Sequence, residues 1–340
     1  MAPKKQQSAT IKDVAEVAGV SVSTVSHAFS GRRPISQETR TRIFAASKTL
    51  GYVPNAHARK LRLGRSGMLG LSLSPSFDFI RTPDDGETFN RLAGSMAIES
   101  LRRGLGLVHV PDLTKAGQDI VPMDGCVVAH PRENDPAVAA LDSIGIPYVL
   151  IDPDPAIDNY PWVVKIDYES GTRAVLDEVS DHGQRPVVLI KEVVRNSWNL
   201  EAVRTYEIWC KDSGVTSAVV EIDQSTRGTE YEDIITEFLS VFEPPFGIVY
   251  LPSDTTNTMI HIASQLGWRI PGDVSLAALT DTVHSRTSAP SMTGLDLAHE
   301  VASTLAITML IDQIEGAEPP GVPVVVAPTV TARESTRLGD

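Results

Sequence analysis

The N-terminal residues carry apolar positions at the spacing that predicts short helices. The apolar face of the first helix is formed by Ile11, Val14, Ala15 and Ala18. Thr10 and Asp13 have the spacing of a capping box, in which two side chains bond to free backbone groups at the start of a helix. Gly19 supplies the conformation that ends this helix.

A second helix is predicted from Val22 to about Phe29, with Ser21 as its N-cap. Its inward positions are Val25, Ala28 and Phe29, and its outward positions are Val22, Ser23, Ser26 and His27. The third helix begins at Ser36, ends at Gly51 and turns inward Ile43, Phe44, Ala46, Ser47 and Leu50. Two short helices joined by a Gly-containing turn predict a helix-turn-helix.

Helix-turn-helix units place the start of their second helix in the major groove of DNA. The candidate DNA contacts there are Ser21, Val22, Ser23, Thr24 and His27. Val22 offers only apolar contact, such as with a thymine methyl group, whereas the His27 ring can bond to a purine edge. Ser23 and Thr24 suit a base or a phosphate equally, and a solvated surface role is the alternative for His27.

A basic segment follows and ends at Gly64. Asn55 can cap a short helix there, which is marginal alone in water and needs a partner to form. Leu61 suits a wedge between base steps in the minor groove, while Arg59, Lys60 and Arg62 suit phosphate contacts. The alternative is a solvated linker helix with Leu61 docked on the following domain.

From Met68 onward, short apolar runs alternate with amphipathic stretches, which predicts parallel sheets with helical crossovers. The predicted strands are 68–73, 105–110, 125–129, 147–151, 163–167, 187–190, 218–222, 247–251, 274–278 and 322–327. The predicted helices are 89–104, 171–182, 200–213, 234–242, 256–266 and 297–315. So many strands favour two lobes, with a ligand expected between them at the carboxyl ends of the strands.

Charge is distributed unevenly along the chain. Residues 1–66 contain 12 Lys and Arg against three acidic residues, a net charge of +9, whereas the whole chain carries −13. The remaining residues therefore carry −22. A basic unit joined to an acidic one predicts a polyanion-binding module on a domain that does not contact nucleic acid.

Other features exclude several classes of protein. Two distant cysteines exclude a disulfide scaffold, and the absence of a long apolar run excludes a membrane span, so we expect a cytoplasmic, nucleoid-associated protein. Motifs of nucleotide, zinc-protease and serine-hydrolase sites are missing, and the histidines lack metal-ligand spacing. We therefore expect no enzyme activity, no metal and no cofactor.

Residues 10–27, together with Arg40, Gly51–Asn55 and Ala58–Leu61, closely resemble the headpiece and hinge of the lactose-repressor (LacI/GalR) family. The resemblance implies a homodimeric transcriptional regulator that binds a double-stranded operator, with Leu61 entering the central base step. It adds these residues to the implied DNA contacts: Thr10, Ser26, Arg40, Asn55 and Ala58. A histidine at position 27 resembles the purine-repressor branch.

The same resemblance continues more weakly through the later part of the chain. It implies a helix-turn-helix headpiece (1–54), a hinge (55–66) and a two-lobed effector domain (67–340) of the periplasmic-binding-protein type. The lobes would comprise 67–166 with 297–320, and 167–296 with 321–340. The chain would cross between them near Asp167, Asp296 and Pro320. No leucine-heptad tail follows Arg333, which favours a dimer over a tetramer.

The sequence departs from the family where a sugar effector would bind. The arginine that clamps sugar hydroxyls in the family falls at Ala202, and the first aspartate of an Asp-Asp pair is Thr280. Without an arginine that binds sugar hydroxyls through two hydrogen bonds, the sequence gives less support to a monosaccharide as the effector.

The candidate effector contacts are residues expected at strand ends or in loops: Phe77, Asp78, Asp152, Trp198, Asn199, Asp254, Asp281 and Asp296. Carboxylates can bind hydroxyl groups, and aromatic rings can stack on a sugar or base. Taken singly, each suits a cap or surface position as well. The effector stays unidentified, and a small-molecule-binding protein without a role on DNA is the alternative function.

Overall fold

The computed structural model describes residues 9–30, 33–52, 65–73, 86–110, 113, 121–181, 183–223, 225–226, 228–251 and 255–337. The chain divides after Ser66 into two compact units. The first contains the headpiece and the second, from Gly67 onward, is here called the body.

Three helices form the headpiece: α1 (Ile11–Ala18), α2 (Val22–Ser30) and α3 (Gln37–Leu50). The predicted capping box is present on α1, and the Ser36 hydroxyl accepts a hydrogen bond from the Thr39 N–H at the start of α3. Gly19 and Gly51 end α1 and α3 at φ 61° and 62°, a region that an L side chain rarely adopts. The headpiece is thus delimited by the caps that its sequence predicts.

A small apolar core holds these helices together. Val14, Val25 and Ile43, one from each helix, are fully buried, with Ala15, Ala18, Ala28 and Ala46 around them. Phe44 differs from the predicted pattern, because its side chain remains 40% exposed.

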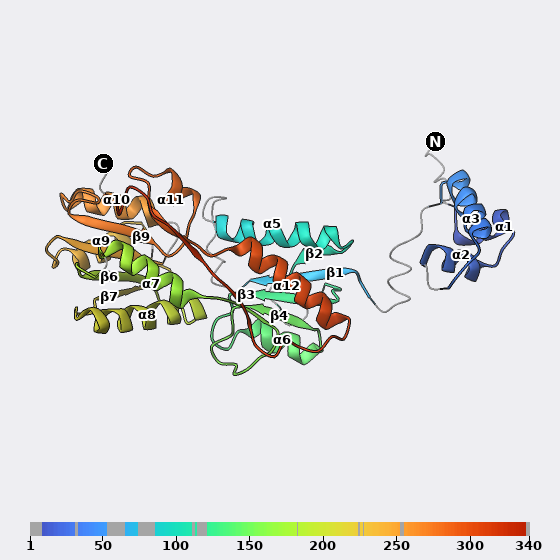
Figure 1. Cartoon of the computed structure of the whole chain (residues 1–340), viewed down its shortest axis with the longest axis horizontal. Helices are drawn as coiled ribbons and strands as arrows, with labels where there is room; N and C mark the ends of the chain where they lie inside the picture. Colours follow the sequence, from blue (N-terminus) through green and yellow to red (C-terminus); the bar gives the residue numbers. More distant parts are fainter. Residues whose placement is uncertain are drawn as a thin grey trace. The chain divides into compact units, whose positions relative to one another are not determined.

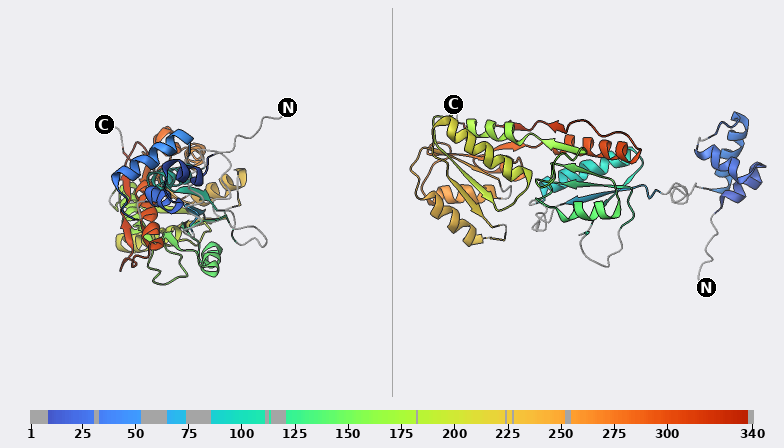
Figure 2. Two further views of the ribbon diagram at one scale, coloured as in Figure 1. Left: turned by 90° about the vertical axis from the view of Figure 1, so that its right-hand side faces the viewer. Right: turned by 90° about the horizontal axis from the view of Figure 1, so that it is seen from below.

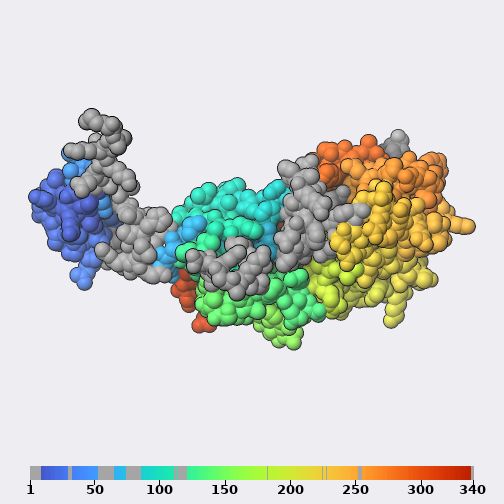
Figure 3. Space-filling view, turned by 180° about the vertical axis from the view of Figure 1, so that it is seen from behind, coloured from blue at the N-terminus to red at the C-terminus, as the bar shows by residue number. Residues whose placement is uncertain are grey.

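The body contains two six-stranded sheets, one in each lobe (Figure 1). Figure 3 shows the surface of the two lobes. The first sheet has the order β11-β5-β4-β3-β1-β2, and its paired strands are all parallel. Its strands are β1 (Met68–Leu73), β2 (Gly106–His109), β3 (Gly125–Ala129), β4 (Tyr148–Ile151), β5 (Val163–Ile166) and β11 (Val324–Val326). The helices of this lobe are α5 (Glu87–Arg102), α6 (Pro136–Ile144) and α12 (His299–Ile314).

Alternating side chains on β3 show how this sheet is covered on both faces. Val127 and Ala129 belong to the core cluster that includes α5 and α12 residues, whereas Cys126 and Val128 belong to the cluster that includes α6 residues. Figure 2 shows α6 in green on the opposite side of the sheet from α12. Burial on both faces explains the continuous apolar runs from which the strands were predicted.

The second sheet has the order β12-β10-β9-β8-β6-β7. Its strands are β6 (Val187–Glu192), β7 (Val219–Ile222), β8 (Phe246–Tyr250), β9 (Val274–Ala278), β10 (Thr293–Asp296) and β12 (Thr329–Thr331), of which β12 runs antiparallel to β10. The helices of this lobe are α7 (Tyr168–Val179), α8 (Ser197–Ser213), α9 (Gly228–Leu239), α10 (Thr256–Gln265) and α11 (Val283–Thr287). Helices α7 and α8 share one core cluster with the sheet, and α9 and α10 share the other.

The chain crosses between the lobes three times. The first crossing lies at Asp167 and the second follows Asp296, as expected. The third was expected near Pro320, which is wrong: β11 still pairs with β5, and β12 is the next strand in the second sheet. The crossing therefore lies at Ala327 and Pro328, where proline ends the strand because it has no N–H to donate.

Four short elements were not predicted: α6, α11, β10 and β12. The α/β fold class and the helix-turn-helix are nevertheless confirmed by the observed element order.

Candidate nucleic-acid interface and interlobe site

The start of α2 presents the side chains that were predicted to contact DNA. Val22 and Ser23 are exposed, whereas Ser26 and His27 are half-buried. The buried Val25 and Ala28 fix α2 to the headpiece core on its other side. An apolar group, a hydroxyl and an imidazole are therefore held on a rigid helix.

Four predicted contacts, Thr10, Ser21, Ser23 and Thr24, take part in hydrogen bonds within the headpiece itself. The Ser21 hydroxyl lies 2.7 Å from both the Ser23 and the Thr24 hydroxyls and accepts from the Thr24 N–H at 3.1 Å. The Thr10 hydroxyl donates to Asp13 at 2.8 Å, and hydrogen bonds from Thr10 lower the pKa of that carboxyl group. Ser21 and Thr10 thus stabilise the first turns of their helices.

Arg40 lies over an aromatic ring on the headpiece surface. Its guanidinium carbon is 5.7 Å from the centre of the Phe44 ring, one turn further along α3. Phe44 contacts Phe29 edge to face at 5.0 Å, and Phe29 in turn packs against Tyr52. The exposed Phe44 therefore links Arg40 to the headpiece core.

Eight predicted site residues lie outside the described residues. They are the hinge residues Asn55, Ala58, Arg59, Leu61 and Arg62 and the effector candidates Phe77, Asp78 and Asp254.

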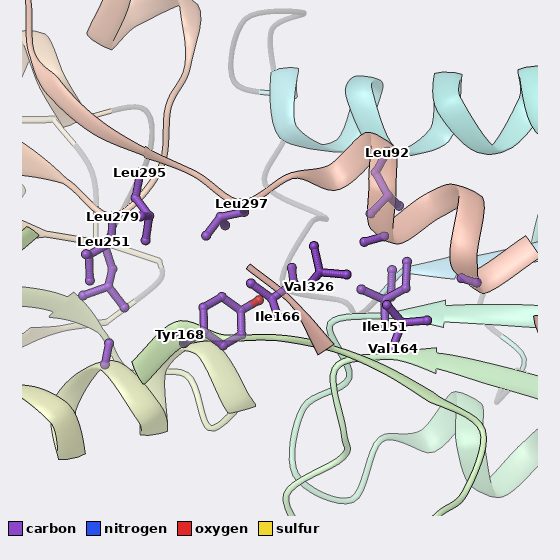
Figure 4. Packing of buried hydrophobic residues seen from close by; sticks show 14 of the residues in the cluster. Leu92, Ile151, Val164, Ile166, Tyr168, Leu251, Leu279, Leu295, Leu297 and Val326 are labelled. Carbon is purple, nitrogen blue, oxygen red and sulfur yellow. The ribbon is translucent and has the colours of Figure 1, made fainter. Parts of the chain in front are cut away.

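In the body, a buried carboxylate lies where the two lobes meet. Asp152 follows β4, is 1% exposed, and accepts hydrogen bonds from His130 Nδ1 at 2.8 Å, the Tyr168 hydroxyl at 2.5 Å and the Ile166 N–H at 3.0 Å. Tyr168 begins α7 of the second lobe, and Figure 4 shows it beside Ile166 and Leu297 at the crossings. Burial, followed by the nearby Asp152 charge, raises the pKa of Tyr168, so its hydroxyl stays a donor.

Aromatic and amide groups from α8 extend this junction. The Trp198 ring stacks on Tyr168 with centroids 6.4 Å apart, and Asn199 donates to Asn196 Oδ1. Among the described residues, neither Trp198 Nε1 nor Asn199 Oδ1 has a hydrogen-bond partner, although both atoms are buried. Buried polar atoms are normally paired, so these two are available to a ligand.

The other two described carboxylate candidates form ion pairs. The Asp281 carboxylate accepts a hydrogen bond from each terminal nitrogen of Arg333, at 2.9 and 3.0 Å. Asp296 lies 3.3 Å from Arg91, which also bonds to Glu300. Their charges are therefore balanced within the body.

Direct contacts join the lobes on the α8 side. Glu133 of the first lobe binds Arg195 through two hydrogen bonds of 2.5 and 3.0 Å, and its N–H donates to the Arg195 carbonyl. Lys165 of β5 lies 2.8 Å from Glu201 of α8. On the opposite side, Glu87 of α5 bonds to Arg286 of α11.

Position 202, where the family's sugar-clamping arginine is expected, lies on α8. Ala202 is fully buried in the core beside Tyr206, so position 202 does not face the other lobe. The preceding residue does, because Glu201 contacts Lys165.

The described residues contain no group of three or more His, Cys, Asp or Glu side chains placed to hold a metal ion. Within the same ranges, no helix combines the length and apolar character needed to cross a membrane.

Comparison with known proteins supports both parts of this architecture. Residues 10–55 match the lacI family of bacterial regulatory proteins, and residues 176–336 match the periplasmic binding protein-like domain. The transcriptional regulator RafR of Escherichia coli is 24% identical over 94% of this chain and 96% of its own length.

Two solved structures share the fold over nearly the whole chain. The lac repressor dimer bound to operator and the anti-inducer ONPF has a TM-score of 0.75 at 19% identity, covering 97% of this chain and 99% of that one. The regulator CelR in complex with cellobiose has a TM-score of 0.68 at 22% identity, covering 96% and 99%.

A helix-turn-helix headpiece on a two-lobed binding domain defines a DNA-binding transcriptional regulator. Its headpiece matches the lacI family of bacterial regulatory proteins, and its body matches the periplasmic binding protein-like domain. This match confirms the resemblance seen in the headpiece sequence.

Removing the ring under Arg40 tests whether Phe44 positions it. We expect Phe44→Leu to weaken DNA binding by about two- to fivefold, the range that a partly exposed cation–π contact of about 0.5–1 kcal/mol supplies. Phe44→Tyr keeps the ring and serves as the control. Titration of labelled DNA by fluorescence anisotropy measures the effect, and equal affinity for both variants would contradict this role.

The buried His299 predicts a pH-dependent stability. Its ring packs 5.7 Å from that of His130, and burial, followed by the charges of His130 and Arg91, holds the pKa of His299 well below its ordinary 6.5. Below about pH 6.5 the unfolded chain binds a proton at this histidine that the folded chain does not bind. The free energy of unfolding therefore decreases as the pH is lowered below this value. Above that value both states are neutral at this site and the stability is level.

Urea unfolding at a series of pH values measures this dependence. We expect His299→Asn to reduce the slope of the free energy of unfolding against pH between about pH 6.5 and 5. This window lies above the usual pKa range of carboxyl groups, so they contribute little to the slope there. An unchanged slope would remove His299 as its source.

Proposed function

We propose that this regulator is a repressor that binds a palindromic operator as a homodimer and is controlled by a small molecule held between its lobes. The observation that carries this proposal is the start of α2, where Val22 and Ser23 are exposed and His27 is half-buried on a basic headpiece. The regulators that the chain resembles support it, including one solved as a dimer on its operator. The role fits a cytoplasmic, nucleoid-associated protein and requires no catalytic step.

On DNA, some residues would read the bases and others would position the headpiece on the duplex. Val22, Ser23 and His27 are the proposed base readers, since their side chains are presented by the helix that enters the major groove. The Ser21 and Thr24 hydroxyls would support the first turn of α2. Arg40 would contact a phosphate from α3, where Phe44 restricts its side chain.

In the body, the proposed effector site lies at the junction around Tyr168, Trp198 and Asn199. Support comes from the buried Trp198 N–H and Asn199 amide oxygen, which supply one donor and one acceptor beside an aromatic surface. Asp152, Asp281 and Asp296 are engaged by partners in the body. We therefore propose an uncharged effector with a ring face and polar edges.

Control by this molecule would act through the lobe contacts. A small molecule bound between the lobes shifts the equilibrium between a closed and an open arrangement. The size of the shift is set by the difference between its affinities for the two arrangements. The Glu133–Arg195 and Lys165–Glu201 pairs, each with one residue per lobe, would be made or broken in that change. The spacing of two hinges in a dimer would then follow the lobe angle.

His27→Ala tests the base-reading role. We expect the variant to keep its affinity for unrelated DNA but to lose preference at one position in each half-site, because a good base contact is worth about 1–3 kcal/mol. Selection from random duplexes, followed by sequencing, measures this for both proteins. Val17→Ala, an exposed α1 substitution, is the matched control. An identical motif for all three would exclude His27 as a reader.

Leu61→Ala tests the predicted wedge. Unstacking a base step is repaid only at the correct site, so we expect specific affinity to fall by at least tenfold, about 1.4 kcal/mol, with non-specific binding nearly unchanged. Leu61→Met keeps an apolar wedge and should retain most of the specific affinity. Equal losses on operator and random DNA would contradict the wedge role.

A further inference from the structure

A row of four rings connects the two lobes beside the crossings. His299 begins α12, and its ring packs edge to face against His130 at 5.7 Å. His130 Nδ1 lies 3.5 Å from the Tyr168 hydroxyl, and Tyr168 stacks on Trp198. The two histidines belong to the first lobe, whereas Tyr168 and Trp198 belong to the second. Figure 4 shows Tyr168 at this junction, next to Leu297 of the second crossing.

The His299 ring has no place for a positive charge in this arrangement. It is 3% exposed, and among the described residues its Nε2 atom has no hydrogen-bond partner. His299 is also the first residue of α12, where the helix dipole disfavours a cation. Burial, followed by the charges of His130 and Arg91, holds the pKa of His299 well below its ordinary value. The ring is therefore neutral while the lobes are in contact.

The charges near the start of α12 already have partners. Helix α12 packs against α5, β3, β4 and β5. The charged groups on or directly after these elements, each with its partners, are Glu87 (with Arg286), Arg91 (with Asp296 and Glu300), Asp152 (with His130 and Tyr168) and Lys165 (with Glu201). Within the described part of the chain, none of these carboxylates bonds to His299. A proton on this ring would thus create a buried charge without a counter-ion.

The backbone at the same junction adopts an uncommon conformation. His130, Asp152 and Ala298 have φ angles of 52°, 66° and 52°, in the left-handed region. Histidine and aspartate enter this region more readily than most residues, whereas alanine has no polar side chain to support it. Residues held in this way gather where a protein switches between arrangements, because the surrounding contacts keep them in place. Here those contacts include the bond between the lobes from Tyr168 to Asp152.

We infer that His299 makes the arrangement of the lobes sensitive to protons, because its ring can take up a proton only after Tyr168 leaves Asp152 and the lobes separate. Separation at the crossings admits water to the rings, and water then solvates the charge. The proton is in this respect a second input to the body, beside the proposed effector. The inference concerns the body itself, and only its consequence for DNA rests on the proposed function.

Linkage gives the size of the effect. If His299 has an ordinary pKa of about 6.5 in the open arrangement and stays neutral in the closed one, lowering the pH from 7.5 to 5.5 favours the open arrangement about tenfold. Above about pH 7.5 the ring is neutral in both arrangements, so the equilibrium between them is level.

Energy transfer between dyes on the two lobes provides the first test. Ile144→Cys and Val241→Cys place pH-insensitive dyes at positions 39% and 76% exposed, and both native cysteines are buried. The labelled full chain is diluted with unlabelled chain, so that only dyes within one copy exchange energy. We expect the transfer efficiency to change between pH 7.5 and 5.5 while the far-ultraviolet circular dichroism stays native. A constant efficiency would overturn the inference.

Substitutions assign the response to His299. His299→Phe keeps a buried ring that cannot take up a proton, so we expect it to reduce the tenfold shift to less than twofold. His299→Asn, with a smaller uncharged side chain, should do the same. His261→Asn removes an exposed histidine of α10 and is the matched control, which should keep the full response. Equal responses in the His299 variants and this control would overturn the inference.

Tyr168→Phe tests the lobe contact without a proton. The variant lacks the hydroxyl that bonds to Asp152, so at pH 7.5 its transfer efficiency should move in the direction that acid produces in the unsubstituted chain. A shift in the opposite direction, or none, would contradict the role of this contact.

Operator affinity separates this inference from the proposed function. The unsubstituted chain and His299→Phe both retain His27, so the ratio of their affinities for a selected duplex isolates the effect of the body. We expect this ratio to change by up to tenfold between pH 7.5 and 5.5. A lobe response without such a change would support the inference and contradict the proposed control through the lobes. Selection of a DNA motif without any lobe response would overturn the inference alone.

Discussion

The hydrogen bonds around the Asp152 carboxylate hold the two lobes of the body together. A charge that is 1% exposed is costly unless it is fully paired, and here His130, Ile166 and Tyr168 supply three donors. Because Tyr168 starts α7 while Asp152 directly follows β4, the cluster joins both lobes beside the crossings. Trp198 of α8, one of the proposed effector contacts, stacks directly on Tyr168 of this cluster.

The headpiece has a different physical basis. Its core consists of a few small and branched side chains, so helix caps at Thr10, Ser36, Gly19 and Gly51 define much of its geometry. With the core on one side, α2 can present polar groups on the other. The charge separation between a basic N-terminal region and an acidic body directs DNA to the headpiece and keeps it from the effector domain.

Much of the fold was predictable because parallel strands that are buried on both faces consist of continuous apolar residues. Strands β3 and β8 are examples. The short elements were missed where that rule fails: β10 and β12 are only four and three residues long, with polar residues at their ends. Asp135 before Pro136 was a readable start signal for α6 that was not used. The site was less predictable, since sequence places Asp281 and Asp296 near the lobe junction but does not show that Arg333 and Arg91 neutralise them.

The most direct test of this account is selection of DNA from a random duplex library by the full-length protein, followed by sequencing. The account predicts an enriched motif with twofold symmetry, its two half-sites arranged for a dimer and a flexible base step at its centre for the hinge leucines. Recovery of unenriched sequence at low salt, with and without candidate effectors, would contradict it.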